Sequence, residues 1–145
     1  MRLGVLGGTF DPPHCGHLIL AEQAREQFSL DCVLWVPAAD PPHKQGRPIT
    51  PVRHRLEMLS LAIPDNPAFE LSLVDVSRPG PHYTADMLAL IQEERQPAHL
   101  YFMVGGDSLR DLTTWHEPAR ILRHATLVVM ARPDSHGHLD ELGRR

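Results

Sequence analysis

The sequence has few cysteines and no long apolar run, and both shortages narrow the class of protein. Two cysteines among 145 residues provide no disulfide framework and fit a reducing compartment. No stretch of about 18 apolar residues is present to span a membrane. The N-terminus runs directly into an apolar, strand-like segment, without the basic and apolar regions of a signal peptide. We therefore expect a soluble cytoplasmic protein that is not exported and has no membrane partner.

The chain also lacks an excess of charge of one sign. The formal net charge is −4, and acidic and basic residues are interspersed along the sequence. That balance argues against broad, non-specific binding to nucleic acid. There is no internal repeat or low-complexity linker, and the length suits one domain that buries about 68–70% of its unfolded surface. We expect a single domain without a nucleic-acid partner. Any bound anion should be held by a local group of residues and not by the overall charge of the protein.

Two common nucleotide-binding fingerprints are missing. No Gly-Lys-Ser/Thr tripeptide occurs, which excludes the classical P-loop. Gly4, Gly7 and Gly8 do not match the G-x-G-x-x-G pattern of dinucleotide-binding folds. The ten histidines raise the alternative of a zinc site, but Cys15 and Cys32 are not spaced for one. We predict no metal held by the protein's own side chains.

The segment 7–17, GGTFDPPHCGH, carries the clearest chemical signal. It follows a short apolar strand, and Gly7 and Gly8 let the chain turn tightly and bring backbone N–H groups against an anion. His14 is expected in the loop and His17 in the first turn of the next helix, where both face the same anion. Imidazole donates to phosphoryl oxygens whether neutral or charged. The glycines alone equally fit an ordinary turn, but the whole segment indicates phosphate binding.

Short apolar segments alternate with amphipathic ones, which is typical of β-α-β units. The pattern predicts an α/β fold, a doubly wound, Rossmann-like parallel sheet of about five strands in the order 3-2-1-4-5. The strands are expected at Arg2–Gly7, Cys32–Pro37, Phe69–Val74, His99–Val104 and Thr126–Ala131.

Helices are expected between these strands. They are predicted over residues 16–28, from Thr50 to Pro64, from Thr84 onward and over residues 117–123, with a shorter helical turn at residues 108–112. Thr50 and Thr84 are expected as hydroxyl N-caps. The buried side of the second helix is predicted to comprise Leu56, Leu59, Leu61 and Ile63.

A second glycine turn supports a ligand site where the strand order reverses, between the first and fourth strands. Gly105 and Gly106 end the fourth strand, and Asp107 then offers a carboxylate for hydroxyl groups or a metal-bound water. Lys44 follows the second strand and can reach a phosphate, although a solvated lysine is the commoner fate. Trp115 is either a core residue or a stacking face for a flat ring. The glycine pair as a mere turn stays an alternative.

Together these motifs resemble the nucleotidylyltransferase superfamily and, within it, the bacterial nicotinate-mononucleotide adenylyltransferases. The match covers nearly the whole chain. The residues that carry it are Gly7–Pro12, His14–His17, Pro41–Lys44, Arg78–Gly80, Tyr83–Thr84, Gly106–Leu109, Trp115 and Arg132–Pro133.

The resemblance implies transfer of AMP from ATP to nicotinate mononucleotide, with Mg²⁺, in NAD biosynthesis. ATP and nicotinate mononucleotide are then the binding partners, and a homo-oligomer is possible. By resemblance, the catalytic residues are His14, His17 and Lys44. The residues expected to bind the nucleotide are Gly7, Gly8, Thr9, Phe10, Gly106 and Asp107, and those expected to bind the pyridine substrate are Tyr83, Thr84, Trp115, His116 and Arg132.

Two departures accompany the resemblance. His82 stands where the family often has Ser. Family members also continue into a C-terminal helical motif that grips the outer phosphates of ATP, whereas this sequence stops at Arg145. We expect a nucleotidylyltransferase domain at residues 1–133 and the start of a truncated region at residues 134–145. The alternatives are a pantetheine-phosphate adenylyltransferase, a small cytidylyltransferase or a nucleotide-binding module without catalysis.

Overall fold

The fold is built on a parallel β-sheet. A computed structural model describes residues 1–8, 10, 15–39, 50–78, 83–105 and 112–130 of the chain. Five strands pair side by side in the order β3-β2-β1-β4-β5, and all four pairings are parallel. The strands are β1 (Arg2–Gly8), β2 (Cys32–Pro37), β3 (Phe69–Leu71), β4 (His99–Gly105) and β5 (Ala125–Met130). The predicted α/β class and strand order are confirmed.

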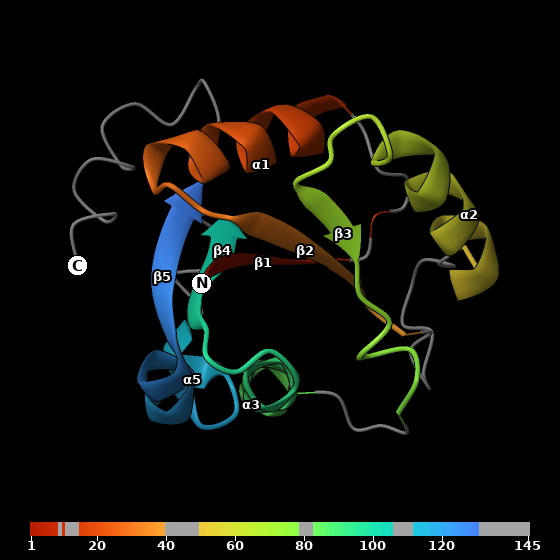
Figure 1. Ribbon diagram of the computed structural model, residues 1–145. Helices are drawn as coiled ribbons and strands as arrows, with labels where there is room; N and C mark the ends of the chain where they lie inside the picture. The colour runs from red at the N-terminus through yellow and green to blue at the C-terminus, as the bar shows by residue number, and fades with distance from the viewer. Residues whose placement is uncertain (9, 11–14, 40–49, 79–82, 106–111, 131–145) are drawn as a thin grey trace.

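Helices cover both faces of the sheet. Figure 1 shows α1 on one face and α3 with α5 on the other, while α2 lies beside β3. The α-helices are α1 (Cys15–Gln27), α2 (Val52–Ala62), α3 (Thr84–Glu94) and α5 (Pro118–His124), and Leu112–Thr114 form a 3-10 turn, η1. No helix in the described part of the chain has the length and apolar character needed to cross a membrane.

Alternation along the central strands divides the core into two clusters. In β2, Val33 and Trp35 pack with residues of α1 and α2, whereas Leu34 and Val36 pack with residues of α3 and α5. Successive side chains of a strand point to opposite faces. A strand covered on both sides is therefore apolar at nearly every position, which is how β1, β2 and β4 appear in the sequence.

The predicted third strand is too long at its carboxyl end. β3 ends at Leu71, although the Ser72 N–H still donates to the Trp35 carbonyl at 2.8 Å. The Ser72 hydroxyl then accepts a bond from the Val74 N–H at 3.4 Å. A serine that bonds its own backbone two residues on favours a turn over a ladder. The apolar residues beyond Leu71 consequently leave the sheet.

Both predicted hydroxyl N-caps are wrong. The N-cap of α2 is Pro51 and that of α3 is Tyr83, and neither makes a side-chain capping bond within the described residues. Thr50 lies one residue before the α2 cap, and Thr84 is already the first helical residue. The fixed φ of proline suits a helix entrance, and the extended backbone of Tyr83 (φ −112°, ψ 142°) leads straight into α3.

The buried side of α2 also differs from the prediction. Leu61 is 82% exposed, whereas Arg55, Leu59 and Ile63 are buried. These three residues follow one another at spacings of four, so they share one face of the helix. Leu61 lies on the opposite face. An arginine within an apolar stripe escaped the hydrophobic pattern because sequence alone does not show what its guanidinium meets.

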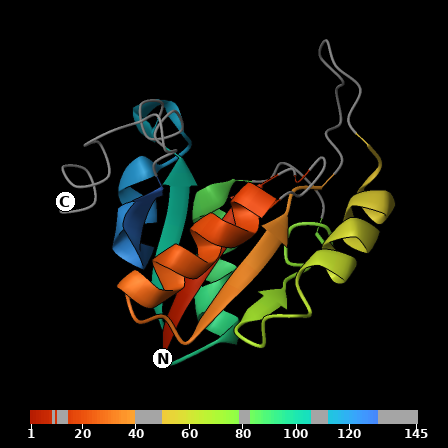
Figure 2. The same cartoon turned by 90° about the horizontal axis from the view of Figure 1, so that it is seen from above.

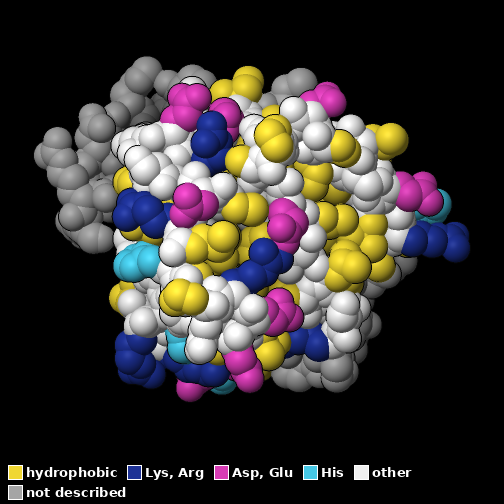
Figure 3. All heavy atoms as spheres, in the orientation of Figure 1, with side chains coloured by type: hydrophobic (Ala, Val, Ile, Leu, Met, Phe, Trp, Pro, Cys, Tyr) yellow, Lys and Arg dark blue, Asp and Glu magenta, His cyan; other side chains and the backbone are white. Residues whose placement is uncertain are grey.

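Charged side chains of both signs mix on one face of the molecule. On the face drawn in Figure 3, acidic and basic groups alternate among hydrophobic and polar atoms. This face agrees with the interspersed charge of the sequence.

Candidate nucleotide-binding site

β1, whose carboxyl end carries Gly7 and Gly8, lies between β2 and β4, at the point where the strand order reverses. β1 pairs with β2 through Gly8↔Pro37 and with β4 through Leu6↔Met103. The chain goes from β1 to β2 and β3 on one side, then returns to β4 and β5 on the other. Figure 2 shows the arrowheads of the parallel strands pointing the same way, so the carboxyl ends of the strands lie along one side of the sheet, its carboxyl edge. Ligands of doubly wound sheets bind at such an edge.

Phe10, close after β1 in the chain, has an unusual backbone conformation. Its φ is +53°, a left-handed value that is rare for a bulky residue. The side chain is only 4% exposed, and its ring lies 5.4 Å from that of Trp35. A Cβ placed on Gly8 would lie 3.3 Å from the Phe10 ring. Gly8 therefore allows the ring to fold back, and such strained residues cluster at functional sites.

His17 lies against the same ring. It is the third residue of α1, and its imidazole packs edge-on against Phe10 with centroids 5.3 Å apart. The amino end of α1 follows β1, so its first-turn N–H groups face the carboxyl edge of the sheet. Two nucleotide residues predicted from the sequence, Gly8 and Phe10, and one predicted catalytic residue, His17, are thus brought together.

A second group of predicted residues meets at the amino end of α3. The rings of Tyr83 and His116 stack with centroids 3.9 Å apart and an interplanar angle of 21°. Trp115 packs edge-on against Phe102 at 6.2 Å. Trp115 packs against the core but is only partly buried. Part of its side chain therefore remains accessible to solvent. Three of the residues expected to bind the pyridine substrate, Tyr83, Trp115 and His116, therefore lie in two segments that contact each other.

An ion network joins α3 to α5 beside this stack, and the sequence analysis missed it. The Nη1 of Arg120 donates to Asp86 Oδ1 at 2.7 Å and to Glu117 Oε2 at 3.1 Å. His116 Nε2 lies 3.3 Å from the same Glu117 oxygen. The bonds to Asp86 and Glu117 raise the pKa of Arg120 above its ordinary value. The Glu117–Arg120 spacing is visible in the sequence, but Asp86 is too distant along the chain to be inferred.

Arg55 ties the end of β2 to the start of α2. It is fully buried; its Nε donates to the Thr50 carbonyl and its Nη1 to the Ala38 carbonyl, both at 2.8 Å. These carbonyls lie at the two ends of the segment that carries Lys44. A charged group taken from water is tolerated only where strong hydrogen bonds replace its hydration. Arg55 therefore fixes both ends of this segment.

Several predicted site residues lie outside the described part of the chain. They are Thr9, His14, Lys44, Gly106, Asp107 and Arg132. The expected helical turn at residues 108–112, except for Leu112, and the boundary at residue 133 lie outside it too. Among the described residues, no three His, Cys, Asp or Glu side chains converge on a metal position.

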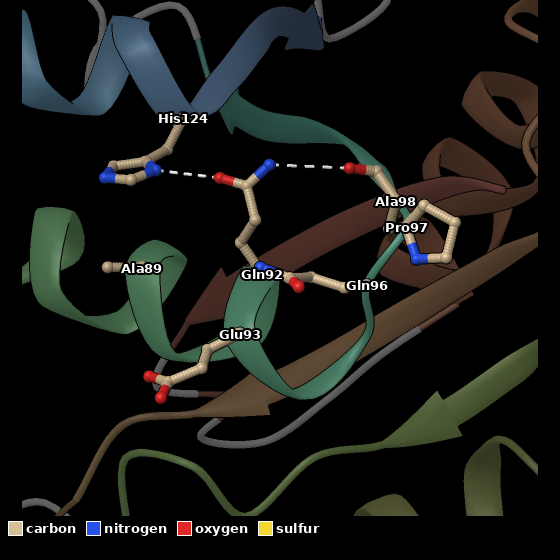
Figure 4. Close-up of a pocket in the computed structure, with 7 residues that line it drawn as sticks. All are labelled: Ala89, Gln92, Glu93, Gln96, Pro97, Ala98 and His124. Carbon is tan, nitrogen blue, oxygen red and sulfur yellow. Dashed lines mark hydrogen bonds between the residues drawn. The ribbon is translucent and has the colours of Figure 1, made fainter.

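A pocket of about 420 Å³ lies opposite the carboxyl ends of the strands, beside the starts of β4 and β5. Gln92 bridges it, with Nε2 donating to the Ala98 carbonyl at 3.4 Å and Oε1 2.8 Å from His124 Nδ1 (Figure 4). β4 and β5 begin directly after Ala98 and His124. The pocket is therefore at the amino ends of these strands, away from the glycine turns, and none of the predicted site residues lines it.

Comparisons with known proteins show the family to which the chain belongs. The cytidylyltransferase-like family matches residues 5–143. A Thermomicrobium roseum protein named "Probable nicotinate-nucleotide adenylyltransferase" is 58% identical over 132 residues, covering 91% of this chain and 62% of its own length. A Thermus thermophilus protein of the same name is 47% identical over 133 residues, covering 92% of this chain and 70% of its own length. The chain thus spans about two thirds of these relatives.

A solved structure shares the fold. The Plasmodium falciparum nicotinic acid mononucleotide adenylyltransferase complexed with NaAD superposes with a TM-score of 0.76 at 21% identity, covering 95% of this chain and 66% of that one. The chain belongs to the cytidylyltransferase-like family, and both relatives described above carry the name "Probable nicotinate-nucleotide adenylyltransferase".

Proposed function

We propose that the protein transfers AMP from ATP to nicotinate mononucleotide, which yields nicotinate adenine dinucleotide and pyrophosphate for NAD biosynthesis. The observation that carries the proposal is the identity to nicotinate-nucleotide adenylyltransferases over nine tenths of the chain. The glycine turn, Phe10 and His17 at the reversal of strand order support a nucleotide site there. The proposal includes a cytoplasmic location and a homo-oligomer. Sedimentation of the purified protein tests the oligomeric state.

The reaction needs no strong general base. A phosphate oxygen of nicotinate mononucleotide is already anionic near pH 7, and it attacks the α-phosphorus of ATP directly. The bond from that phosphorus to the bridging oxygen breaks, and pyrophosphate leaves with the electron pair. The protein aligns the two phosphates and neutralises the charge that develops. No covalent intermediate on the protein is required.

The phosphate side of the site is assigned to the first motif. His17, held edge-on by Phe10 at the amino end of α1, donates to an α-phosphoryl oxygen, and the first-turn N–H groups and helix dipole assist it. His14 is proposed as its companion, and Lys44 as a point charge on phosphate. Gly7, Gly8 and Thr9 supply backbone contacts, while Gly106 and Asp107 lie near the ribose.

The pyridine side is assigned to the amino end of α3. The first hydrogen bond of α3 runs from the Met87 N–H to the Tyr83 carbonyl, so the N–H groups of Thr84, Ala85 and Asp86 precede it. We assign the nicotinate carboxylate to the Thr84 end of this helix, where N–H groups and the dipole favour an anion. Trp115 offers a stacking face for the ring, with Tyr83 and His116 beside it; Arg132 is proposed as a further contact.

Magnesium enters this proposal with the triphosphate of ATP. Mg²⁺ at such sites is held largely by substrate phosphates and water, with one or two carboxylates. The described residues do not fit a metal held by protein side chains alone. The steps above are therefore assigned to the protein's own groups.

A substrate matrix tests the proposal. Purified protein is incubated with magnesium and either ATP or CTP, together with nicotinate mononucleotide or pantetheine phosphate, and products are identified by mass spectrometry. We expect nicotinate adenine dinucleotide with ATP and nicotinate mononucleotide as the dominant product. A dominant product from pantetheine phosphate or CTP would favour the sister enzymes. Nucleotide binding by calorimetry with no product in any combination would favour a non-catalytic module.

A further inference from the structure

The ion network between α3 and α5 places an arginine beside the helix end assigned to the substrate carboxylate. Asp86 is the third residue of α3 and the acidic residue of its first turn. Arg120 bonds it from α5 at 2.7 Å and also bonds Glu117. The network continues from Glu117 to His116, and His116 stacks on Tyr83. These contacts run from Asp86 through Arg120, Glu117 and His116 back to Tyr83, so they start and end at the amino end of α3.

Asp86 has two opposed electrostatic effects at this position. A carboxylate in the first turn stabilises a helix, because it faces the positive end of the dipole. The same negative charge opposes a second anion at that helix end, since like charges within a few ångströms disfavour one another. The cation bonded directly to Asp86 offsets this repulsion. The amino end of α3 can then accept a carboxylate although it carries an acidic residue.

We infer that Arg120 is a positioning residue that sets the preference for the anionic nicotinate ring over the neutral nicotinamide ring. It acts by neutralising Asp86, to which it bonds at 2.7 Å. This inference rests on the proposed function. The Arg120, Asp86 and Glu117 side chains are 29%, 38% and 48% exposed. Solvent therefore screens the network, and the expected effect is modest and sensitive to salt.

The test compares Arg120→Gln with the parent protein on both mononucleotides. We expect the KM for nicotinate mononucleotide to rise about three- to fivefold, because the interaction of one charge with a helix end changes affinity by about that factor. The kcat and the KM for nicotinamide mononucleotide should stay within about twofold. The rise should shrink in high salt. Equal increases in both KM values would overturn the inference, because lost packing affects both substrates.

A double variant separates charge from structure. If Arg120 acts through Asp86, Asp86→Asn combined with Arg120→Gln should restore the KM for nicotinate mononucleotide to within about twofold of the parent. Arg120→Lys keeps the charge and should retain the preference. Arg123→Gln removes an exposed positive charge from the same helix and serves as the matched control, with both KM values unchanged. A double variant as impaired as Arg120→Gln would refute the mechanism.

Two further outcomes are distinguishable. If Arg120→Gln does not fold, Asp86→Asn alone carries the test, and it should leave the KM for nicotinate mononucleotide unchanged or lower it; a higher value would overturn the inference. A parent protein that forms no dinucleotide from either mononucleotide would overturn the proposed function and this inference together. An active parent whose substrate preference survives Arg120→Gln would overturn the inference alone.

Discussion

Tyr83 and His116 form a stacked pair whose ring centroids lie 3.9 Å apart with planes at 21°. Tyr83 is the N-cap of α3, and His116 directly precedes the N-cap of α5. The pair therefore connects two helix entrances at the carboxyl edge of the sheet. By resemblance, both residues are expected to bind the pyridine substrate. Their contact joins two of the segments that carry residues proposed for the pyridine side.

Removing the stack should weaken both the fold and the proposed pocket. His116→Ala is expected to lower the free energy of unfolding by about 0.5–1 kcal/mol, since aromatic pairs contribute about that much and this pair is partly exposed. The KM for nicotinate mononucleotide should also rise. His116→Phe keeps a flat ring and should retain most of the stability in urea titrations. Equal losses in the two variants would show that stacking is not the relevant contact.

His17 is expected to act mainly in the transition state. His17→Ala should lower turnover about 10²–10³-fold, as loss of one transition-state donor does, while the affinity for ATP changes far less. Initial rates and calorimetric titration of ATP measure the two effects. His54→Ala, at an exposed position of α2, is the matched control and should keep full turnover. A His17→Ala protein within twofold of the parent would refute the assigned role.

Arg55 is expected to carry an unusual share of stability for a charged residue. Arg55→Met removes the donors to the Ala38 and Thr50 carbonyls within a closed site, and should cost about 2–4 kcal/mol of unfolding free energy. Arg53→Met changes an exposed arginine of the same helix and should cost less than about 0.5 kcal/mol. Urea titration compares them. Similar losses would show that the buried bonds of Arg55 matter little.

Cys32 should be a slow nucleophile in the folded protein. Burial and, secondarily, the nearby Glu70 carboxylate raise the pKa of the Cys32 thiol. Because the folded state disfavours the thiolate, alkylation near pH 8 should be slower than in the urea-unfolded chain and should accelerate only at higher pH. By the same linkage, Cys32 lowers stability as the pH rises through the pKa of the unfolded thiol.

Peptide mass spectrometry of iodoacetamide-treated protein follows Cys32 separately from Cys15. The unfolded chain provides the internal control, since it contains the same peptide. Equal alkylation rates at pH 8 in the folded and unfolded states would contradict the raised pKa.

Most of the fold could be predicted because its determinants are local. Apolar strands alternate with amphipathic helices, and right-handed crossovers then leave few possible strand orders. β2 was predicted at its observed bounds for this reason. The end of β3 was not, because the bond from the Val74 N–H to the Ser72 hydroxyl competes with the ladder. Thr84 was assigned to a cap because the residue type fits one, although Tyr83 occupies that position.

Without the family resemblance, contacts between candidate site residues could be predicted where those residues share one motif. Gly8, Phe10 and His17 are close in sequence, so their proximity follows from one strand and one helix. Asp86 and Arg120 belong to different crossovers, and nothing in their local sequence links them. Arg55 illustrates the same difficulty, because its role depends on carbonyls at the ends of a distant segment.

Direct transfer of AMP from ATP to nicotinate mononucleotide, without a covalent intermediate, can be followed by the fate of the α-phosphorus. The measurement uses ATP radiolabelled at the α-phosphorus, with magnesium and nicotinate mononucleotide, followed by separation of protein, dinucleotide and pyrophosphate. We expect the transferred label in nicotinate adenine dinucleotide, in amounts equal to the pyrophosphate released, with none bound to protein. Label attached covalently to the protein, or pyrophosphate released without labelled dinucleotide, would contradict direct transfer.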